Sequence, residues 1–130
     1  RLFFMPPRPY LPTGTLRDAI CYPSSCRIFT RDQVEQTLRA AGLESLIDQL
    51  DQRDHWTNTL TLGEQQRLGM VRLLLKRPQW IFLQEAFDAL DPEEEQRMLQ
   101  LICEQLPESA ILAISRQPDG ESFYTRRLSL

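Results

Sequence analysis

The sequence predicts an α/β fold in which a parallel sheet with crossover helices is joined to an α-helical subdomain. In the second half of the chain, short continuous apolar runs at Trp80–Leu83 and Ala110–Ile114 alternate with segments of helical periodicity. Such runs are typical of strands buried on both faces of a parallel sheet, and the alternation favours strands joined by crossover helices. Residues 15–60 instead carry helix-capping signals and helical spacing, which predict a small helical insertion.

The first half is expected to begin with a strand and then become helical. The apolar residues 2–5 predict the end of a buried strand, and the prolines at 6, 7, 9 and 12 predict an extended loop. Thr15 is placed to cap a short helix, and Thr30 with Gln33 forms a capping box that opens a helix ending near Gly42. Another short helix is expected over residues 43–50, and residues 51–59 are predicted to be polar and irregular.

In the second half, a longer helix is expected to begin near Gly63 or Glu64 and to end before Pro78. The next helix has three agreeing start signals, which are an N-cap at Asp91, a proline in the first turn and an acidic residue at the third position. Its inward-facing residues are predicted to be Met98, Leu99, Ile102 and Leu106. A final, more polar strand is predicted over residues 123–130.

The composition bounds the possible functions. With 42% hydrophobic and 25% charged residues, the 130-residue chain suits a soluble domain or part of one. Its net charge of −3 argues against a non-specific nucleic-acid binder, so we expect no nucleic-acid partner. No apolar run approaches the roughly 20 residues that span a bilayer. The three cysteines form no regular framework, which favours reduced thiols in a cytosolic setting.

The strongest functional signal is the segment Leu60–Leu68, with the sequence LTLGEQQRL. Here a hydroxyl, a glycine and a polar side chain lie where a loop becomes a helix, so free backbone N–H groups and the helix dipole can face an anion. The segment resembles the signature motif of ATP-binding-cassette (ABC) proteins, usually LSGGQ followed by QR. The resemblance implies nucleotide contacts from Thr61, Leu62, Gly63 and Glu64. The residues alone also allow a capped amphipathic helix without a ligand.

A second segment, WIFLQEAFDALD at Trp80–Asp91, follows about 20 residues later. A carboxylate at the end of a buried parallel strand lies at the sheet edge where α/β folds bind ligands. The segment resembles the Walker B and D-loop motifs of ABC proteins, typically hhhhDEATSALD. The resemblance implies that Glu85 is the catalytic residue that orients and polarises the attacking water, and that Asp91 communicates across a dimer. Asp91 is equally suited to cap the following helix, and the two roles are compatible.

A third segment, PYLPTGTLRDAICYP at Pro9–Pro23, resembles the Q-loop region of ABC exporters. Together with LGEQQRL, it indicates the branch that contains peroxisomal fatty-acyl transporters and bacterial SbmA/BacA-like transporters. The resemblance covers nearly the whole chain and implies the C-terminal part of one ABC ATP-binding domain, with a partial P-loop NTPase fold. It places the Q-loop region in residues 1–23, the helical subdomain in about 24–62, and the signature helix and C-terminal strands in 63–130.

The resemblance breaks at the positions that hold a domain's own nucleotide and metal. The phosphate-binding loop (Walker A), which precedes the Q-loop in the family, is not in the sequence. Pro7 aligns with the Q-loop glutamine, Gln84 with the Walker B aspartate and Arg116 with the switch histidine. Proline offers no amide, a neutral glutamine does not balance the charge of Mg²⁺, and arginine does not titrate near neutral pH. We therefore assign no residue of this chain as a metal ligand. The signature and D-loop residues that are kept serve mainly the opposite subunit's nucleotide in the family.

These features predict a fragment of the ATP-binding subunit of an ABC exporter with a degenerate nucleotide site, on the cytoplasmic face of a membrane. ATP and Mg²⁺ are the expected cofactors of the complete domain. The expected partners are a membrane-spanning domain and a second nucleotide-binding domain. The alternative is a non-catalytic regulatory or interaction module that keeps the shape of the cassette, and general decay of the sequence is also open. In isolation, the chain is expected to expose apolar sheet edges.

Overall fold

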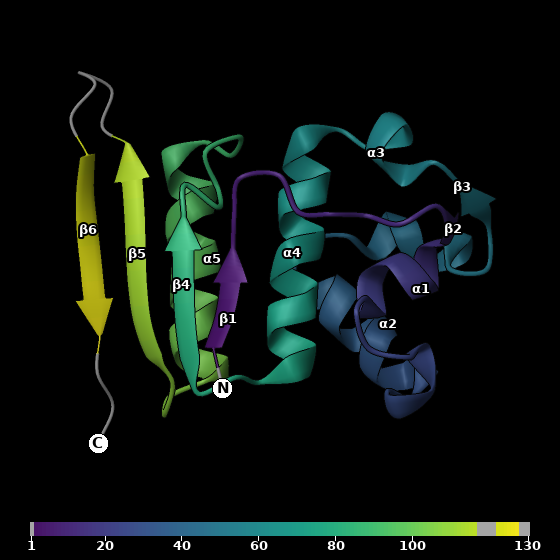
Figure 1. Ribbon diagram of the computed structural model, residues 1–130, viewed down its shortest axis with the longest axis horizontal. Coiled ribbons are helices and arrows are strands. Elements are labelled where there is room, and N and C mark those ends of the chain that lie inside the picture. The colour runs from purple at the N-terminus through teal and green to yellow at the C-terminus, as the bar shows by residue number, and fades with distance from the viewer. Residues whose placement is uncertain (1, 117–121, 128–130) are drawn as a thin grey trace.

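The computed structural model describes residues 2–116 and 122–127, with side chains described through Ile114 except that of Cys26. Its centre is a four-stranded sheet in the order β1 (Leu2–Met5), β4 (Trp80–Gln84), β5 (Ala110–Arg116) and β6 (Ser122–Arg127). The pairs β1–β4 and β4–β5 are parallel, and β5–β6 is antiparallel. The helix α5 (Pro92–Gln105) makes the crossover from β4 to β5 (Figure 1). The predicted α/β class and parallel sheet are confirmed. The last predicted strand is present through Arg127, and residues 128–130 lie outside the described residues.

One face of this sheet is packed and the other is open. The register aligns Met5, Leu83 and Ala113 in one row, and all three are buried against the helical layer. In the neighbouring row, Phe4 is 48% exposed and Leu112 is 37% exposed. Leu2 at 64% and Trp80 at 54% extend the same open face. The structure thus shows exposed apolar surface on a sheet face, whereas the sequence led us to expect it at the edges.

The helical layer is built on α4 (Leu62–Lys76), which lies between the sheet and the helices of residues 16–59 (Figure 1). Its glycine at 69 lets it approach β1 closely, because a Cβ there would lie 2.7 Å from Cε of Met5. On its other side pack α1 (Leu16–Cys21) and α2 (Arg31–Ala40). Two 3₁₀ helices, η1 (Cys26–Ile28) and η2 (Glu44–Gln49), complete this part, the second where a short helix was predicted.

The prediction of an irregular segment over residues 51–59 is wrong, although the segment is polar apart from Trp56. The short strands β2 (Gly14–Thr15) and β3 (Arg53–Asp54) pair there, and the short helix α3 (Trp56–Thr59) follows. Trp56 is fully buried, and its indole N–H donates to the carbonyl oxygen of Gly14 at 2.9 Å. One large apolar residue therefore orders a segment whose flanking residues are all polar, because its burial and hydrogen bond depend on a segment 42 residues earlier.

The predicted helix starts are confirmed in detail. The hydroxyl of Thr30 accepts from the backbone N–H of Gln33 at 3.0 Å, and the Gln33 side chain accepts from the backbone N–H of Thr30 at 2.8 Å. The carboxylate of Asp91 accepts from the backbone N–H of Glu94 at 2.8 Å, with Pro92 in the first turn of α5. Met98, Ile102 and Leu106 are buried as predicted, and Leu99 is half-buried.

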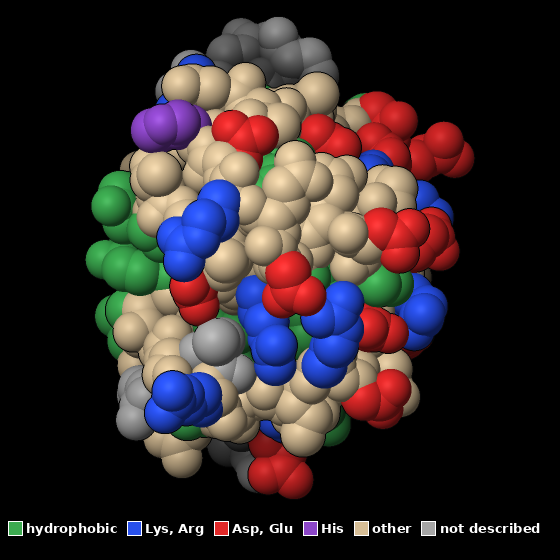
Figure 2. Space-filling view, turned by 90° about the vertical axis from the view of Figure 1, so that its right-hand side faces the viewer, with side chains coloured by type: hydrophobic (Ala, Val, Ile, Leu, Met, Phe, Trp, Pro, Cys, Tyr) green, Lys and Arg blue, Asp and Glu red, His purple; other side chains and the backbone are tan. Residues whose placement is uncertain are grey.

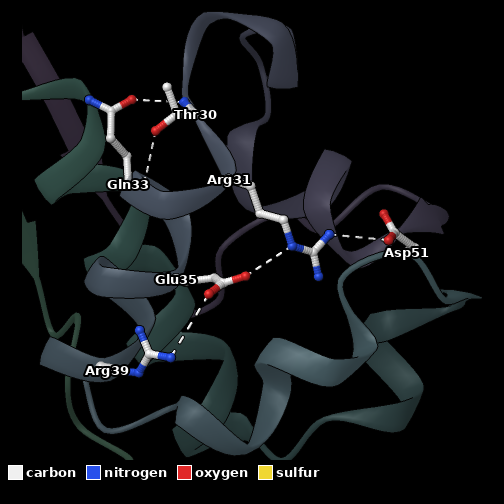
Figure 3. A network of polar contacts seen from close by, with 6 residues as sticks. All are labelled: Thr30, Arg31, Gln33, Glu35, Arg39 and Asp51. Carbon is white, nitrogen blue, oxygen red and sulfur yellow. Dashed lines mark hydrogen bonds and ion pairs between the residues drawn. The ribbon is translucent and has the colours of Figure 1, made fainter.

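The outer surface of the helical part is charged with both signs interspersed, as Figure 2 shows. A chain of ion pairs runs along α2, in which Arg31 contacts Glu35 at 2.9 Å and Asp51 at 3.2 Å, and Arg39 contacts Glu35 at 3.9 Å (Figure 3). Arg31, Arg39 and Asp51 are solvent-exposed and Glu35 is partly exposed, so each pair contributes little to stability. None of the described helices has the length and apolar character needed to cross a membrane.

Candidate functional site

The segment Leu60–Leu68 contains the N-terminus of α4. This helix begins at Leu62, one residue before Gly63, the earlier of the two predicted starts. Thr61 is the N-cap, and its hydroxyl accepts from the backbone N–H of Glu64 at 3.1 Å. The Glu64 carboxylate in turn accepts from the backbone N–H of Thr61 at 2.9 Å, which completes a capping box. The Thr61 hydroxyl keeps its own hydrogen for donation to a ligand. Leu62 and Gly63 occupy the first two helical positions, whose N–H groups have no intrahelical partner in an α-helix.

The start of α4 touches the turn that follows β4. A Cβ on Gly63 would lie 3.4 Å from Cδ2 of Leu90 and 3.9 Å from the carbonyl oxygen of Ala89. The start of α4 therefore lies within van der Waals reach of this turn, with room for a Cβ at position 63. The structure thus places the signature-like residues beside the turn at residues 88–90, which follows Glu85 in the chain.

Glu85 directly follows β4 and has an unusual backbone conformation. Its φ is +48°, in the left-handed region that L-residues other than Asn and Asp rarely adopt. Its backbone N–H donates to the carbonyl oxygen of Ile114 in β5 at 2.8 Å, and this hydrogen bond holds the residue against the neighbouring strand. A residue persists in this conformation only where the surrounding structure enforces it, and such residues cluster at active sites and ligand-binding sites. Glu85 lies at the carboxyl end of a parallel strand, at the edge where α/β folds bind ligands.

Asp91 caps α5 through the hydrogen bond to Glu94, so the structural role considered for it is confirmed. Its side chain remains exposed. The dimer role inferred from the resemblance stays a prediction.

Sequence reasoning missed the residue that connects these segments, Gln66. Its side chain is fully buried, and its amide N–H₂ donates to the carbonyl oxygen of Pro7 at 2.8 Å and to the carboxylate of Asp88 at 2.7 Å. Its amide oxygen accepts from the backbone N–H of Ala89 at 2.9 Å. A helical signal was present in the sequence, because Gly69, Met70 and Leu73 follow at spacings of three, four and seven and are all buried.

A second buried polar residue of α4, Arg72, anchors the proline-rich loop. Its guanidinium donates to the carbonyl oxygens of Ala19 and Tyr10 and lies over the Tyr22 ring, 5.5 Å from its centroid. Desolvation by burial lowers the pKa of Arg72 to about 10, so the side chain stays charged at neutral pH. Because Arg72 holds α1 and the loop against α4, it fixes the path of the chain between Met5 and Thr15.

The positions that depart from the family pattern lie together. Pro7 follows β1, Gln84 ends β4 and Arg116 ends β5, and these three strands are neighbours in the sheet. The Gln84 side chain is exposed, and that of Arg116 lies outside the described side chains. Among the described residues, no group of three or more His, Cys, Asp or Glu side chains is placed to hold a metal ion.

The chain was also compared with known proteins by sequence and by structure. No protein-family model matches the chain. It is 39% identical over 127 residues, or 98% of its length, to an uncharacterized ABC transporter ATP-binding protein of Haemophilus influenzae, of which it covers 21%. It is 34% identical over 85% of its length to the Escherichia coli inner membrane ABC transporter ATP-binding protein YddA, covering 19% of it. It is also 33% identical over 99% of its length to ABC transporter D family member 1 of Arabidopsis thaliana, covering 10% of it.

A solved structure shows the same fold. A bacterial Atm1-family ABC exporter with ATP bound superimposes with a TM-score of 0.76 over 91% of this chain and 21% of the exporter chain, at 24% sequence identity. The chain spans about a fifth of the length of the Haemophilus and Escherichia relatives.

Proposed function

Because the chain belongs to the ABC transporter ATP-binding family, we propose that it is the C-terminal part of an exporter's nucleotide-binding domain, which couples ATP binding and hydrolysis to transport. The observation that carries the proposal is the close approach of Gly63 to Ala89 and Leu90, in the turn that follows the left-handed Glu85. This contact joins a helix start suited to an anion with a carboxylate at the edge of a parallel sheet.

The start of α4 fits the phosphates of ATP. The N–H groups of Leu62 and Gly63 point along the helix axis with the positive end of the dipole, and Thr61 supplies a hydroxyl hydrogen. In the proposed arrangement, Thr61, Leu62, Gly63 and Glu64 bind the nucleotide held by an opposing domain, and Asp91 lies at the same interface. Glu85 accepts a proton from the attacking water at its carboxylate.

The chain's own nucleotide site is proposed to be degenerate. Pro7, Gln84 and Arg116 replace the glutamine, aspartate and histidine that the family uses there. The residues at this edge fit Mg²⁺ poorly, because the Gln84 amide is neutral and cannot offset the charge of a divalent cation. The chain would then complete a partner's site while its own site turns over slowly or not at all.

The proposed partners follow from the same assignment. A second nucleotide-binding domain faces the start of α4, and a membrane-spanning domain contacts the proline-rich loop and the neighbouring helical part. The proposed location is the cytoplasmic face of a membrane, which agrees with the inner-membrane relative YddA.

Two capping boxes provide a matched test in the full-length protein. Thr61→Ala and Thr30→Ala each remove a cap that contributes about 1 kcal/mol. If Thr61 contacts nucleotide, only Thr61→Ala should also lower ATP-dependent closure of the paired domains, measured by cross-linking, and ATP turnover. Equal effects of the two variants on closure and turnover would reject the nucleotide contact.

The neutral Gln84 favours a second candidate, a non-catalytic module that keeps the cassette shape. It predicts that the full-length protein either binds Mg·ATP without turnover or does not bind it, and that Glu85→Gln changes nothing. A turnover that falls on the order of 10²-fold in Glu85→Gln would decide for the catalytic reading.

A further inference from the structure

Gln66 joins three segments that are far apart in sequence. Its single amide group bonds to the loop after β1, at Pro7, and to the turn after β4, at Asp88 and Ala89, while its backbone belongs to α4. Both amide hydrogens and the amide oxygen are used, and the side chain is fully buried. A buried amide satisfied in this way has one orientation, since rotating it would break all three bonds.

The neighbouring residue shows that this arrangement is particular to Gln66. Gln65 is also buried, but its amide donates to the carbonyl oxygens of Thr57 and Leu60, only eight and five residues away. Gln65 therefore stabilises the local approach to α4, whereas Gln66 spans 59 residues to Pro7 and 22 residues to Asp88.

The bond to Pro7 matters because this position lacks the side chain the family resemblance leads one to expect. Proline keeps its backbone carbonyl, and that carbonyl is what Gln66 binds. We propose that Gln66 is a positioning residue that clamps the Pro7 loop to the 85–91 turn, so that displacement of one is transmitted to the other. This inference rests on the proposed function for its effect on turnover, but the clamp itself does not require nucleotide.

The clamp can be measured by hydrogen exchange in the full-length protein, with mass spectrometry of the peptides covering residues 3–11 and 85–91. Gln66→Leu should speed exchange in both peptides by about tenfold, because buried partners on both sides lose their hydrogen bonds. Gln65→Leu, the matched control, should leave both peptides unchanged. Asp88→Ala removes the carboxylate that accepts from Gln66 and does not touch the bond to Pro7. If the clamp transmits displacement, this variant should still speed exchange in residues 3–11 a few-fold.

A charge-swap pair separates the two halves of the clamp and covers the case in which Gln66→Leu does not fold. Gln66→Glu removes both donors, so both peptides should exchange faster. Adding Asp88→Asn returns a donor opposite the new carboxylate, which should restore protection in residues 85–91 but not in 3–11, where the Pro7 carbonyl still lacks a donor. In ATP hydrolysis, the double variant should keep a lowered kcat with an unchanged KM.

The proposal is overturned if Asp88→Ala and Gln66→Glu leave exchange in residues 3–11 unchanged, since Gln66 would then stabilise only its own surroundings. It is also overturned if the double variant regains wild-type kcat, since the Pro7 bond would then be dispensable. A wild-type protein that shows neither ATP-dependent closure nor ATP turnover would refute the proposed function, and the exchange measurements would still decide whether the clamp exists.

Discussion

Replacing Glu85 by glycine should give a more stable protein than replacing it by alanine, and both replacements should remove the activity. At φ +48°, an L-residue costs about 1–2 kcal/mol, which glycine does not incur. Glycine loses about 0.5–1 kcal/mol more backbone entropy on folding. The difference favours Glu85→Gly over Glu85→Ala by about 0.5–1 kcal/mol, or a few degrees in thermal unfolding of the full-length protein. Both variants lack the carboxylate, so both should lose turnover by about 10² or more.

Arg77 provides the control for this comparison. It has the same φ of +48° at the C-cap of α4, and its guanidinium donates to the carbonyl oxygen of Gln105. Arg77→Gly should likewise unfold above Arg77→Ala, but with unchanged turnover. Equal unfolding temperatures for Glu85→Gly and Glu85→Ala would show that the position stores no strain, and wild-type turnover in Glu85→Gly would remove Glu85 from the mechanism.

Three further predictions concern the degenerate site and the buried polar contacts. In the full-length protein, Gln84→Asp with Arg116→His should raise ATP turnover, and adding Glu85→Gln should abolish most of the gain. If the double variant binds nucleotide normally but its turnover does not rise, another position limits turnover, and Pro7 would be tested next. Trp56→Phe should lower the free energy of unfolding by about 2 kcal/mol, because the Gly14 carbonyl loses its donor and a buried volume is left empty; an unchanged melting temperature would contradict this. Arg72→Met should cost about 2 kcal/mol by leaving the buried Ala19 carbonyl without its donor, and faster proteolysis of the loop at residues 6–12 would report the loss of anchoring.

The elements that the sequence predicted well are those with local signals. The caps at Thr30 and Asp91 involve residues three positions apart, so their side-chain types and spacing sufficed. The strands at residues 80 and 110 were visible as uninterrupted apolar runs bounded by polar residues.

The features that sequence reasoning missed depend on partners far along the chain. Trp56 orders its segment through Gly14, and Gln66 is satisfied by Pro7 and Asp88. Helical spacing predicts that position 66 is buried, but it does not say which buried groups will meet the amide. The left-handed Glu85 has no local signal either, because the preference at φ +48° is for glycine or asparagine, and the surrounding sheet imposes the conformation.

The placement of the altered residues bears on whether the domain is specialised or decaying. Pro7, Gln84 and Arg116 lie at the ends of three adjacent strands, so the changes lie along one edge of the sheet. The start of α4 keeps a complete capping box and its close contact with the turn at Ala89 and Leu90. A chain decaying without constraint would be expected to lose the box or the close contact as readily as the residues of that edge, since the Thr61 cap contributes only about 1 kcal/mol. The segregation therefore favours the proposed domain, in which the chain's own site is weakened and the surface that completes a partner's site is retained.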